Sequence, residues 1–219
     1  MKILALELSS ARGSIAWLDT KTRSARAPTA AREGACSPQK EEFDREWPND
    51  RKNSGPFFEH LSKVQKQFAK PDMIVVGLGP GSYAGTRIAI SAAIGLQVAS
   101  RARLIGFPSI CAIEYDAPEY CVIGDARRNS FFYTRICGGN LTEDPDLMSE
   151  AELREKLAKL DKKMSIFTTE KLPQFDRAEL RYPAARMLAQ LATDSKRTFA
   201  RPPLEPMYLR EPHITTPKK

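Results

Sequence analysis

The sequence carries the same order of features twice: an apolar run that ends in a carboxylate, a short turn with an arginine, and a second run. The two copies occupy residues 3–19 and 121–136, and their carboxylates are Glu7 and Asp125. Each copy has the run lengths and the polar turn that are typical of a β-hairpin. A helix, a strand and a second helix are expected after each hairpin, so the order of elements indicates an internal duplication.

Hydrophobic periodicity and helix-capping signals predict the remaining elements. Strands are expected at 1–7, 13–19, 42–47, 72–78, 104–106, 120–125, 130–136 and 163–168, and helices at 55–69, 85–100, 109–115, 149–160 and 182–192. This pattern predicts an α/β protein of two lobes, each a mixed sheet flanked by helices. We expect an N-terminal lobe at 1–106 with an insertion at 21–41, a C-terminal lobe at 107–200, and an extended basic tail at 201–219.

The composition favours a packed core, because 42% of the residues are hydrophobic and 28% are charged. The four cysteines show no Cys-x-x-Cys spacing, and the two histidines, His60 and His213, lie far apart. The sequence therefore predicts no metal site, no bound cofactor and no disulfide framework. The longest weakly polar stretch, residues 88–99, is too short to span a bilayer, and the first apolar run is too short for a signal peptide. We expect a cytoplasmic protein without membrane contact.

The net charge of +7 is unevenly distributed along the chain. Residues 1–100 carry +4, residues 101–195 carry −1, and residues 196–219 carry +4. A basic tail favours contact with the phosphates of RNA, through side chains such as Lys196 and Arg197. The alternative is a solvated tail that only aids solubility, since few aromatic residues lie among its charges.

The most informative stretch is VVGLGPGSYAGTRIAISAAIGL at residues 75–96, which predicts a strand, a glycine-rich turn and a helix. Glycine permits a positive φ or a close backbone approach, and the N–H groups at a helix start often hold an anion. The turn is therefore either a phosphate-binding loop or a tight turn that only redirects the chain. It lacks the Gly-Lys-Ser/Thr of a P-loop. The residues of this glycine-loop signature are Gly79, Pro80, Gly81, Ser82, Gly85 and Arg87.

The helix after this turn is apolar on nearly every side, so every side has to be covered. The sheet covers one face, and the helix expected at 55–69 is the natural neighbour of another. We expect the two helices to form a partner interface; the alternative is that both belong to the core of one lobe. The residues expected at the interface are Phe57, Leu61, Val64, Phe68, Ile88, Ala92, Ala93 and Leu96.

Four segments, in the same order along the chain, resemble the TsaB (YeaZ) family. GPGSYAGTR at 79–87 is similar to the family signature Gly-Pro-Gly-Ser-Phe-Thr-Gly-x-Arg, with Tyr83 and Ala84 where Phe and Thr are usual. The opening MKILALELSS resembles that of the family, with Glu7 and Leu8 in place of the usual Asp-Thr. The segments GDARRN and PMYLREP resemble its Asp-Ala-Arg-Arg and Pro-x-Tyr-Leu-Arg segments.

The order of elements also resembles the actin, heat-shock-protein-70 and sugar-kinase superfamily, a two-lobed, ribonuclease-H-like fold whose hairpin carboxylates face a cleft. The TsaB resemblance implies a non-catalytic scaffold subunit of the complex that makes threonylcarbamoyladenosine at position 37 of tRNA. It implies TsaD and TsaE-type subunits as partners, and a homodimer when the chain is alone. TsaD carries a His-x-x-x-His metal pair, which this sequence lacks, so we expect no catalytic residues.

Two other functions stay open at this point. A small ATPase or kinase of the same superfold would use Glu7 and Asp125 to hold magnesium-bound water, and the glycine loop to hold phosphates. The alternative for each acid is a hairpin-end residue that bonds to the backbone. A stand-alone RNA-binding module would account for the net charge of +7, but no predicted strand interleaves aromatic and basic residues.

Overall fold

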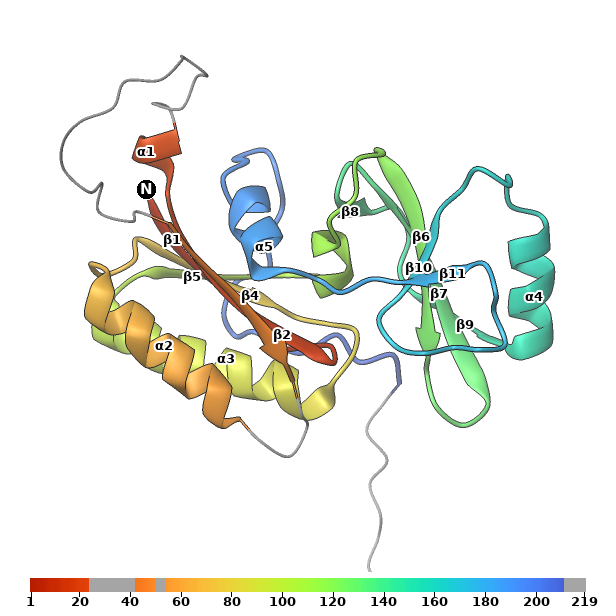
Figure 1. Ribbon diagram of the computed structural model, residues 1–219, viewed down its shortest axis with the longest axis horizontal. Helices are drawn as coiled ribbons and strands as arrows, with labels where there is room; N and C mark the ends of the chain where they lie inside the picture. Colours follow the sequence, from red (N-terminus) through yellow and green to blue (C-terminus); the bar gives the residue numbers. More distant parts are fainter. Residues whose placement is uncertain (24–41, 50–53, 211–219) are drawn as a thin grey trace, which may run out of the picture.

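The computed structural model describes residues 1–23, 42–49 and 54–210, and it contains two mixed sheets side by side (Figure 1). The first sheet has the order β3-β2-β1-β4-β5, with β1 antiparallel to β2 and parallel to β4. Its strands, all predicted from the sequence, are β1 (Lys2–Glu7), β2 (Arg12–Asp19), β3 (Glu42–Pro48), β4 (Met73–Gly77) and β5 (Arg103–Phe107). A short helix, α1 (Thr20–Arg23), follows β2. From residue 24 onward, the predicted insertion at 21–41 lies outside the described residues.

Two predicted helices, α2 (Gly55–Gln67) and α3 (Tyr83–Ser100), lie together on one face of this sheet (Figure 1). Phe57, Leu61 and Val64 recur at helical spacing along α2 and are buried against the sheet. Ser82 caps the start of α3, because its hydroxyl oxygen accepts a hydrogen bond of 3.3 Å from the Gly85 N–H. The buried faces of both helices form one hydrophobic cluster with the strands.

The second sheet has the order β11-β10-β6-β7-β8, and β9 pairs with β7. Its strands are β6 (Glu119–Asp125), β7 (Ser130–Cys137), β8 (Asn140–Leu141), β9 (Asp146–Ser149), β10 (Ile166–Thr168) and β11 (Ala178–Leu180). The sequence predicts β6, β7 and β10 but misses the other three, which are too short to show a period. Helix α4 (Glu150–Ala158) begins with the expected capping box between Ser149 and Glu152. The segment expected as a helix at 109–115 is a short 3-10 helix, η1 (Ser109–Ala112).

A single hydrophobic core joins the two lobes. It contains Ile3 from β1, Val122 from β6 and Leu188 from α5 (Ala185–Leu191). Helix α5 packs on β1, β2 and β4, so it covers the face of the first sheet that α2 and α3 leave open (Figure 1). We expected residues 107–200 to form the C-terminal lobe as one unit. Instead, the chain returns to the first lobe at α5, because that apolar face of the sheet needs a cover.

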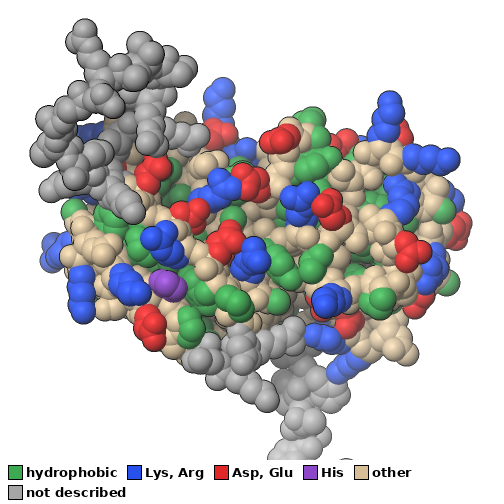
Figure 2. Space-filling model, in the orientation of Figure 1, with side chains coloured by type: hydrophobic (Ala, Val, Ile, Leu, Met, Phe, Trp, Pro, Cys, Tyr) green, Lys and Arg blue, Asp and Glu red, His purple; other side chains and the backbone are tan. Residues whose placement is uncertain are grey.

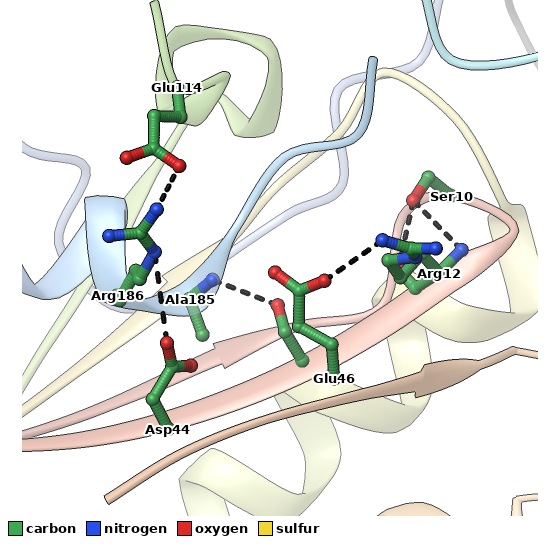
Figure 3. A network of polar contacts seen from close by, with 8 residues as sticks. Ser10, Arg12, Asp44, Glu46, Glu114, Ala185 and Arg186 are labelled. Carbon is green, nitrogen blue, oxygen red and sulfur yellow. Dashed lines mark hydrogen bonds and ion pairs between the residues drawn. The ribbon is translucent and has the colours of Figure 1, made fainter. Parts of the chain in front are cut away.

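Polar contacts fix α5 to the first sheet (Figure 3). The Ala185 N–H donates a buried hydrogen bond of 2.8 Å to the Ser14 hydroxyl oxygen, across 171 residues of sequence. The Arg186 guanidinium lies between Glu114, to which it donates a hydrogen bond, and Asp44, at 3.7 Å. Burial raises the pKa of the Asp44 carboxyl, while Arg186 acts in the opposite direction.

After α5 the chain runs back across the first lobe as a segment that we call the C-terminal strap, residues 199–210. Ala200 and Gly106 exchange two backbone hydrogen bonds of 3.0 Å, and Leu204 is buried in the first hydrophobic cluster. The Met207 N–H donates to the Leu78 carbonyl oxygen at 2.8 Å. We predicted an extended tail at 201–219. Residues 201–210 contain no helix or strand, and Leu204 and Met207 attach them to the first lobe; residues 211–219 lie outside the described residues.

Candidate functional site

A cleft of about 470 Å³ lies where the two lobes meet. Its walls come from the β1–β2 turn, the glycine loop before α3, the end of the β6–β7 hairpin and the C-terminal strap. The side chains and backbone that line it include Ser9, Ser10, Pro80, Gly81, Ser82, Tyr83, Asp125, Arg127, Phe132, Glu170, Met207, Tyr208 and Leu209. Together with residues 169–170 after β10, the fold thus brings five segments that are distant in sequence to one hollow, and four of them carry the segments that resemble TsaB.

The glycines of the loop are explained by its contact with the first hairpin. A Cβ on Gly81 would lie 2.1 Å from the Ser9 carbonyl oxygen, and one on Gly85 would lie 2.0 Å from the Leu8 carbonyl oxygen. Gly79 has a φ of +95°, which side chains disfavour. The spacing of these glycines is therefore dictated by close backbone packing against the β1–β2 turn.

Several backbone N–H groups of this loop already have acceptors within the protein. The Ser82 N–H donates to the Ser9 carbonyl oxygen, the Gly79 N–H to the Ser109 hydroxyl at 2.9 Å, and the Gly85 N–H to the Ser82 hydroxyl. A phosphate-binding loop points such groups at its ligand. The geometry therefore favours the tight-turn interpretation over the phosphate-loop interpretation.

Glu7 lies beneath the cleft, contrary to our expectation of an acid that faces it. The side chain is wholly buried, and its Oε1 accepts a hydrogen bond of 2.6 Å from the Ser9 N–H. A Cβ on Gly77 would lie 1.7 Å from the carboxyl Oε2, so the backbone of β4 presses against it. Burial raises the pKa of Glu7, and hydrogen bonding with Ser9 and Ser109 offsets only part of that effect. The bond with the Ser9 N–H matches the alternative of a hairpin-end acid that bonds to the backbone, and the side chain is enclosed because the last residue of β1 still lies in the core.

Asp125, the second predicted cleft acid, does line the cleft. Its carboxylate accepts hydrogen bonds from the Arg127 backbone N–H at 2.6 Å and from the Arg127 guanidinium at 2.9 Å. These contacts match the alternative of a hairpin-end acid bonded to the backbone. The turn itself is unusual, because Arg127, Arg128 and Asn129 all have φ between 55° and 66°. Such backbone strain is concentrated at functional sites in many proteins.

Arg87, the last residue of the glycine signature, lies over the ring of Tyr83, 4.7 Å from its centroid, and donates a hydrogen bond to its hydroxyl. The Tyr208 ring from the strap lies 5.6 Å from that of Tyr83. Our predicted site omitted Tyr208, although the PMYLREP segment that carries it was one of the four TsaB-like segments. The sequence segment was recognised, but only the folded strap places Tyr208 beside the glycine loop.

The predicted partner interface divides into buried and accessible residues. Phe57, Leu61, Val64 and Ala93 are buried in the core of the first lobe, as the alternative interpretation held. The other four predicted residues, Phe68, Ile88, Ala92 and Leu96, are half-buried against the same cluster. The exposed apolar side chains of these helices are instead Phe58, Ile94 and Val98, and Val98 is 78% exposed. Helical periodicity alone could not tell which face meets the sheet, because α3 is apolar all round.

Charge gives no further site on the visible face of the molecule, where basic and acidic side chains are mixed (Figure 2). Arg197, which we expected in a basic RNA-binding tail, donates hydrogen bonds to the Gly138 and Gly139 carbonyl oxygens. It therefore holds the β7–β8 turn. Within residues 1–23, 42–49 and 54–210, no three His, Cys, Asp or Glu side chains are grouped as metal ligands. Nor does the described part of the chain contain a helix long and apolar enough to cross a membrane.

Two lobes with related hairpins, a mixed sheet in each and a cleft between them define the class of actin, heat-shock-protein-70 and sugar-kinase-like folds, as predicted. The chain belongs to the family of TsaD, described as tRNA N6-adenosine threonylcarbamoyltransferase, whose model matches residues 57–211. No curated protein matches the sequence significantly.

Two solved structures from Pseudomonas aeruginosa have the same fold. An uncharacterized protein with similarity to peptidase YEAZ superposes with a TM-score of 0.64 at 21% identity, over 95% of this chain and 99% of that one. YeaZ itself superposes with a TM-score of 0.58 at 18% identity, over 88% and 92%. The expected likeness to the TsaB (YeaZ) group of proteins is thereby confirmed in family and fold.

Proposed function

We propose that this chain is the TsaB-type, non-catalytic subunit of a cytoplasmic tRNA threonylcarbamoyladenosine complex, and that it binds a TsaD-type subunit. Membership of the TsaD family and the YeaZ fold supply the context. The observation that carries the proposal is the outer surface of α3, which exposes Ile94 and Val98 and carries no charged residue over its second half.

The exposed residues of α3 form a stripe with the spacing of successive helical turns. Ser91, Ile94, Gly95 and Val98 lie on it, and Ile94 is 45% exposed. A Cβ on Gly95 would meet no atom within 4 Å, so the helix surface is open there. Small and branched apolar side chains in this arrangement allow the close approach of a second helix. We define these four residues as the α3 stripe and propose it as the contact with the TsaD-type subunit.

The non-catalytic part of the proposal is supported by the sequence and by the cleft. The chain has only two histidines, His60 and His213, 153 positions apart, and no His-x-x-x-His pair. Near the cleft, Glu7 is buried and Asp125 is paired with Arg127. A small ATPase or kinase, the other candidate, would need these acids at the cleft surface and free loop N–H groups.

The test is light scattering coupled to size-exclusion chromatography, on the chain alone and mixed with the TsaD-type protein of the same source. We expect a one-to-one complex, and a self-dimer of the isolated chain through the same stripe. Val98→Asp places a charge on the stripe without touching the core, and it should abolish both associations. Leu180→Asp, an equally drastic change at an exposed position of the second lobe, is the matched control.

Either of two results would count against the proposal. A chain that stays monomeric and does not join the TsaD-type protein has no such scaffold role. Magnesium-dependent ATP hydrolysis by the isolated chain that Asp125→Ala abolishes would instead establish the ATPase alternative.

A further inference from the structure

The mouth of the cleft carries two exposed aromatic rings in contact. Tyr83 is 53% exposed and Tyr208 is 41% exposed, and their rings lie 5.6 Å apart at a tilt of 38°. They come from the glycine loop and the C-terminal strap, so the packed strap holds the pair in place. Adjoining exposed aromatic rings often serve as contact surfaces, because such rings gain little by facing water.

Arginine side chains from both lobes lie beside this pair, in the strap that carries Tyr208, or in the turn that lines the cleft. Arg87 lies over the Tyr83 ring, and Arg210 donates a hydrogen bond of 2.5 Å to the Ser130 hydroxyl at the end of the β6–β7 hairpin. Arg127 lines the cleft, and Arg128 follows it in the same strained turn. Among the residues that the structure describes, Arg87, Arg128 and Arg210 form no ion pair; Arg127 alone is paired, with Asp125. Among the described residues these three guanidinium groups therefore have no direct carboxylate partner; Glu170 lines the same cleft, and Glu205 acts electrostatically on Tyr208.

We propose that Tyr83, Tyr208 and the arginines Arg87, Arg128 and Arg210 form a binding surface for unpaired RNA, on which bases stack while phosphates meet the guanidinium groups. This inference rests on the proposed function, which supplies tRNA as the ligand. Exposed aromatic platforms beside positive charge are the usual means of holding single strands. RNA loops, whose bases are unstacked, suit such a platform better than a paired stem.

The alternative occupant is a protein, since Tyr83 and Arg87 lie on the same helix as the α3 stripe. Two features favour RNA. The charges come from both lobes. Arg128 and Arg210 do not belong to α3, so binding of a protein to the α3 stripe would not account for them. The arginines without an ion-pair partner among the described residues, Arg87, Arg128 and Arg210, can take phosphate oxygens as partners.

The experiment measures the affinity of the isolated, full-length chain for a labelled RNA hairpin with an unpaired loop, by fluorescence anisotropy at several salt concentrations. A blunt RNA duplex of the same length is the comparison. We expect the hairpin to bind more tightly than the duplex. Tyr208→Ala should weaken hairpin binding roughly five- to a hundredfold, as the loss of one stacked base does, and Tyr208→Phe should retain it.

Charge is tested separately from stacking. Arg128→Gln should reduce the slope of log affinity against log salt by about 0.7, the value for one phosphate contact on a single strand. Arg103→Gln, at an exposed position at the opposite end of the first sheet, is the matched control and should leave the slope unchanged. The Tyr208→Phe variant guards against misfolding, because it keeps the packing of the strap.

Three outcomes would overturn the inference: equal affinity for hairpin and duplex, unchanged affinity in both Tyr208→Ala and Arg128→Gln, or loss of TsaD-type binding in these variants with RNA affinity intact. The last outcome would assign the surface to a protein. If the wild-type chain forms the complex but binds no RNA hairpin, the inference fails and the proposed function stands. If the wild-type chain binds the RNA hairpin but never joins a TsaD-type subunit, only the proposed function fails.

Discussion

Replacing Glu7 by glutamine tests whether this buried carboxyl is neutral in the folded protein. The side chain is wholly enclosed, its Oε1 accepts a hydrogen bond from the Ser9 N–H, and burial raises its pKa. An ionised carboxylate in that position would be a buried charge without a cation beside it, which is far more costly than a buried amide. Glutamine has the same shape and keeps an oxygen for the Ser9 N–H.

The pH dependence follows from the direction of the shift. Because the pKa of Glu7 is raised on folding, the folded protein keeps this proton at pH values where the unfolded chain has released it. The stabilising contribution is fully present below the unfolded pKa and is lost as the pH rises through the folded pKa. Between these two values the wild type loses about 1.4 kcal/mol of stability per pH unit, and Glu7→Gln avoids that loss.

The assay is thermal and urea unfolding of wild type and Glu7→Gln at pH values from 4 to 8, in steps of about one pH unit. We expect the two proteins to be nearly equally stable near pH 4, and the variant to gain steadily above it. Each kcal/mol corresponds to a rise of about 2–4 °C in Tm for a chain of this size. Glu59→Gln, on the exposed side of α2, is the matched control and should show no such divergence. Parallel stability curves for wild type and Glu7→Gln would refute the argument, since they would mean that folding does not shift the pKa.

Other predictions concern the packing of the fold, and each is measured by urea unfolding. Gly85→Ala should destabilise by about 1–3 kcal/mol, because its Cβ would lie 2.0 Å from the Leu8 carbonyl oxygen. Gly95→Ala on the same helix should instead stabilise by about 0.5–1 kcal/mol, since that surface is open; equal effects would contradict the packing argument. Ser149→Ala removes the cap of α4 and should cost about 1 kcal/mol. Leu204→Ala should cost about 2–5 kcal/mol, whereas a negligible effect would mean that the strap is not part of the core.

Much of the fold could be predicted because its signals are local. The hairpins of residues 3–19 and 121–136 show in the sequence as apolar runs with polar turns, and their pairing is antiparallel as expected. The capping box of α4 requires only Ser149 and Glu152, three positions apart. The short strands β8, β9 and β11 escaped prediction, because two to four residues give no periodicity against which to judge them.

The candidate site was predicted less well, for a different reason. The sequence identified the glycine loop and Asp125, and both line the cleft. It placed Glu7 at the cleft surface, whereas the side chain lies in the core. It omitted Tyr208, which reaches the site only because the strap crosses the first lobe. Residues come together here over long stretches of sequence, and no local pattern encodes such a contact.

The sequence by itself determined most of the elements, their duplicated order and the family, because hydrophobic period, turn residues and capping groups act over a few positions. Tertiary structure alone decided which side of each element is covered. Helix α5 returns to the first sheet, where the Ala185 N–H meets the Ser14 hydroxyl 171 residues away. The glycines are required by the carbonyl oxygens of Leu8 and Ser9, which the sequence does not place beside them. Whether a side chain is buried depends on the segments that pack around it. Burial, and with it the role of each residue, is therefore decided only once the chain has folded.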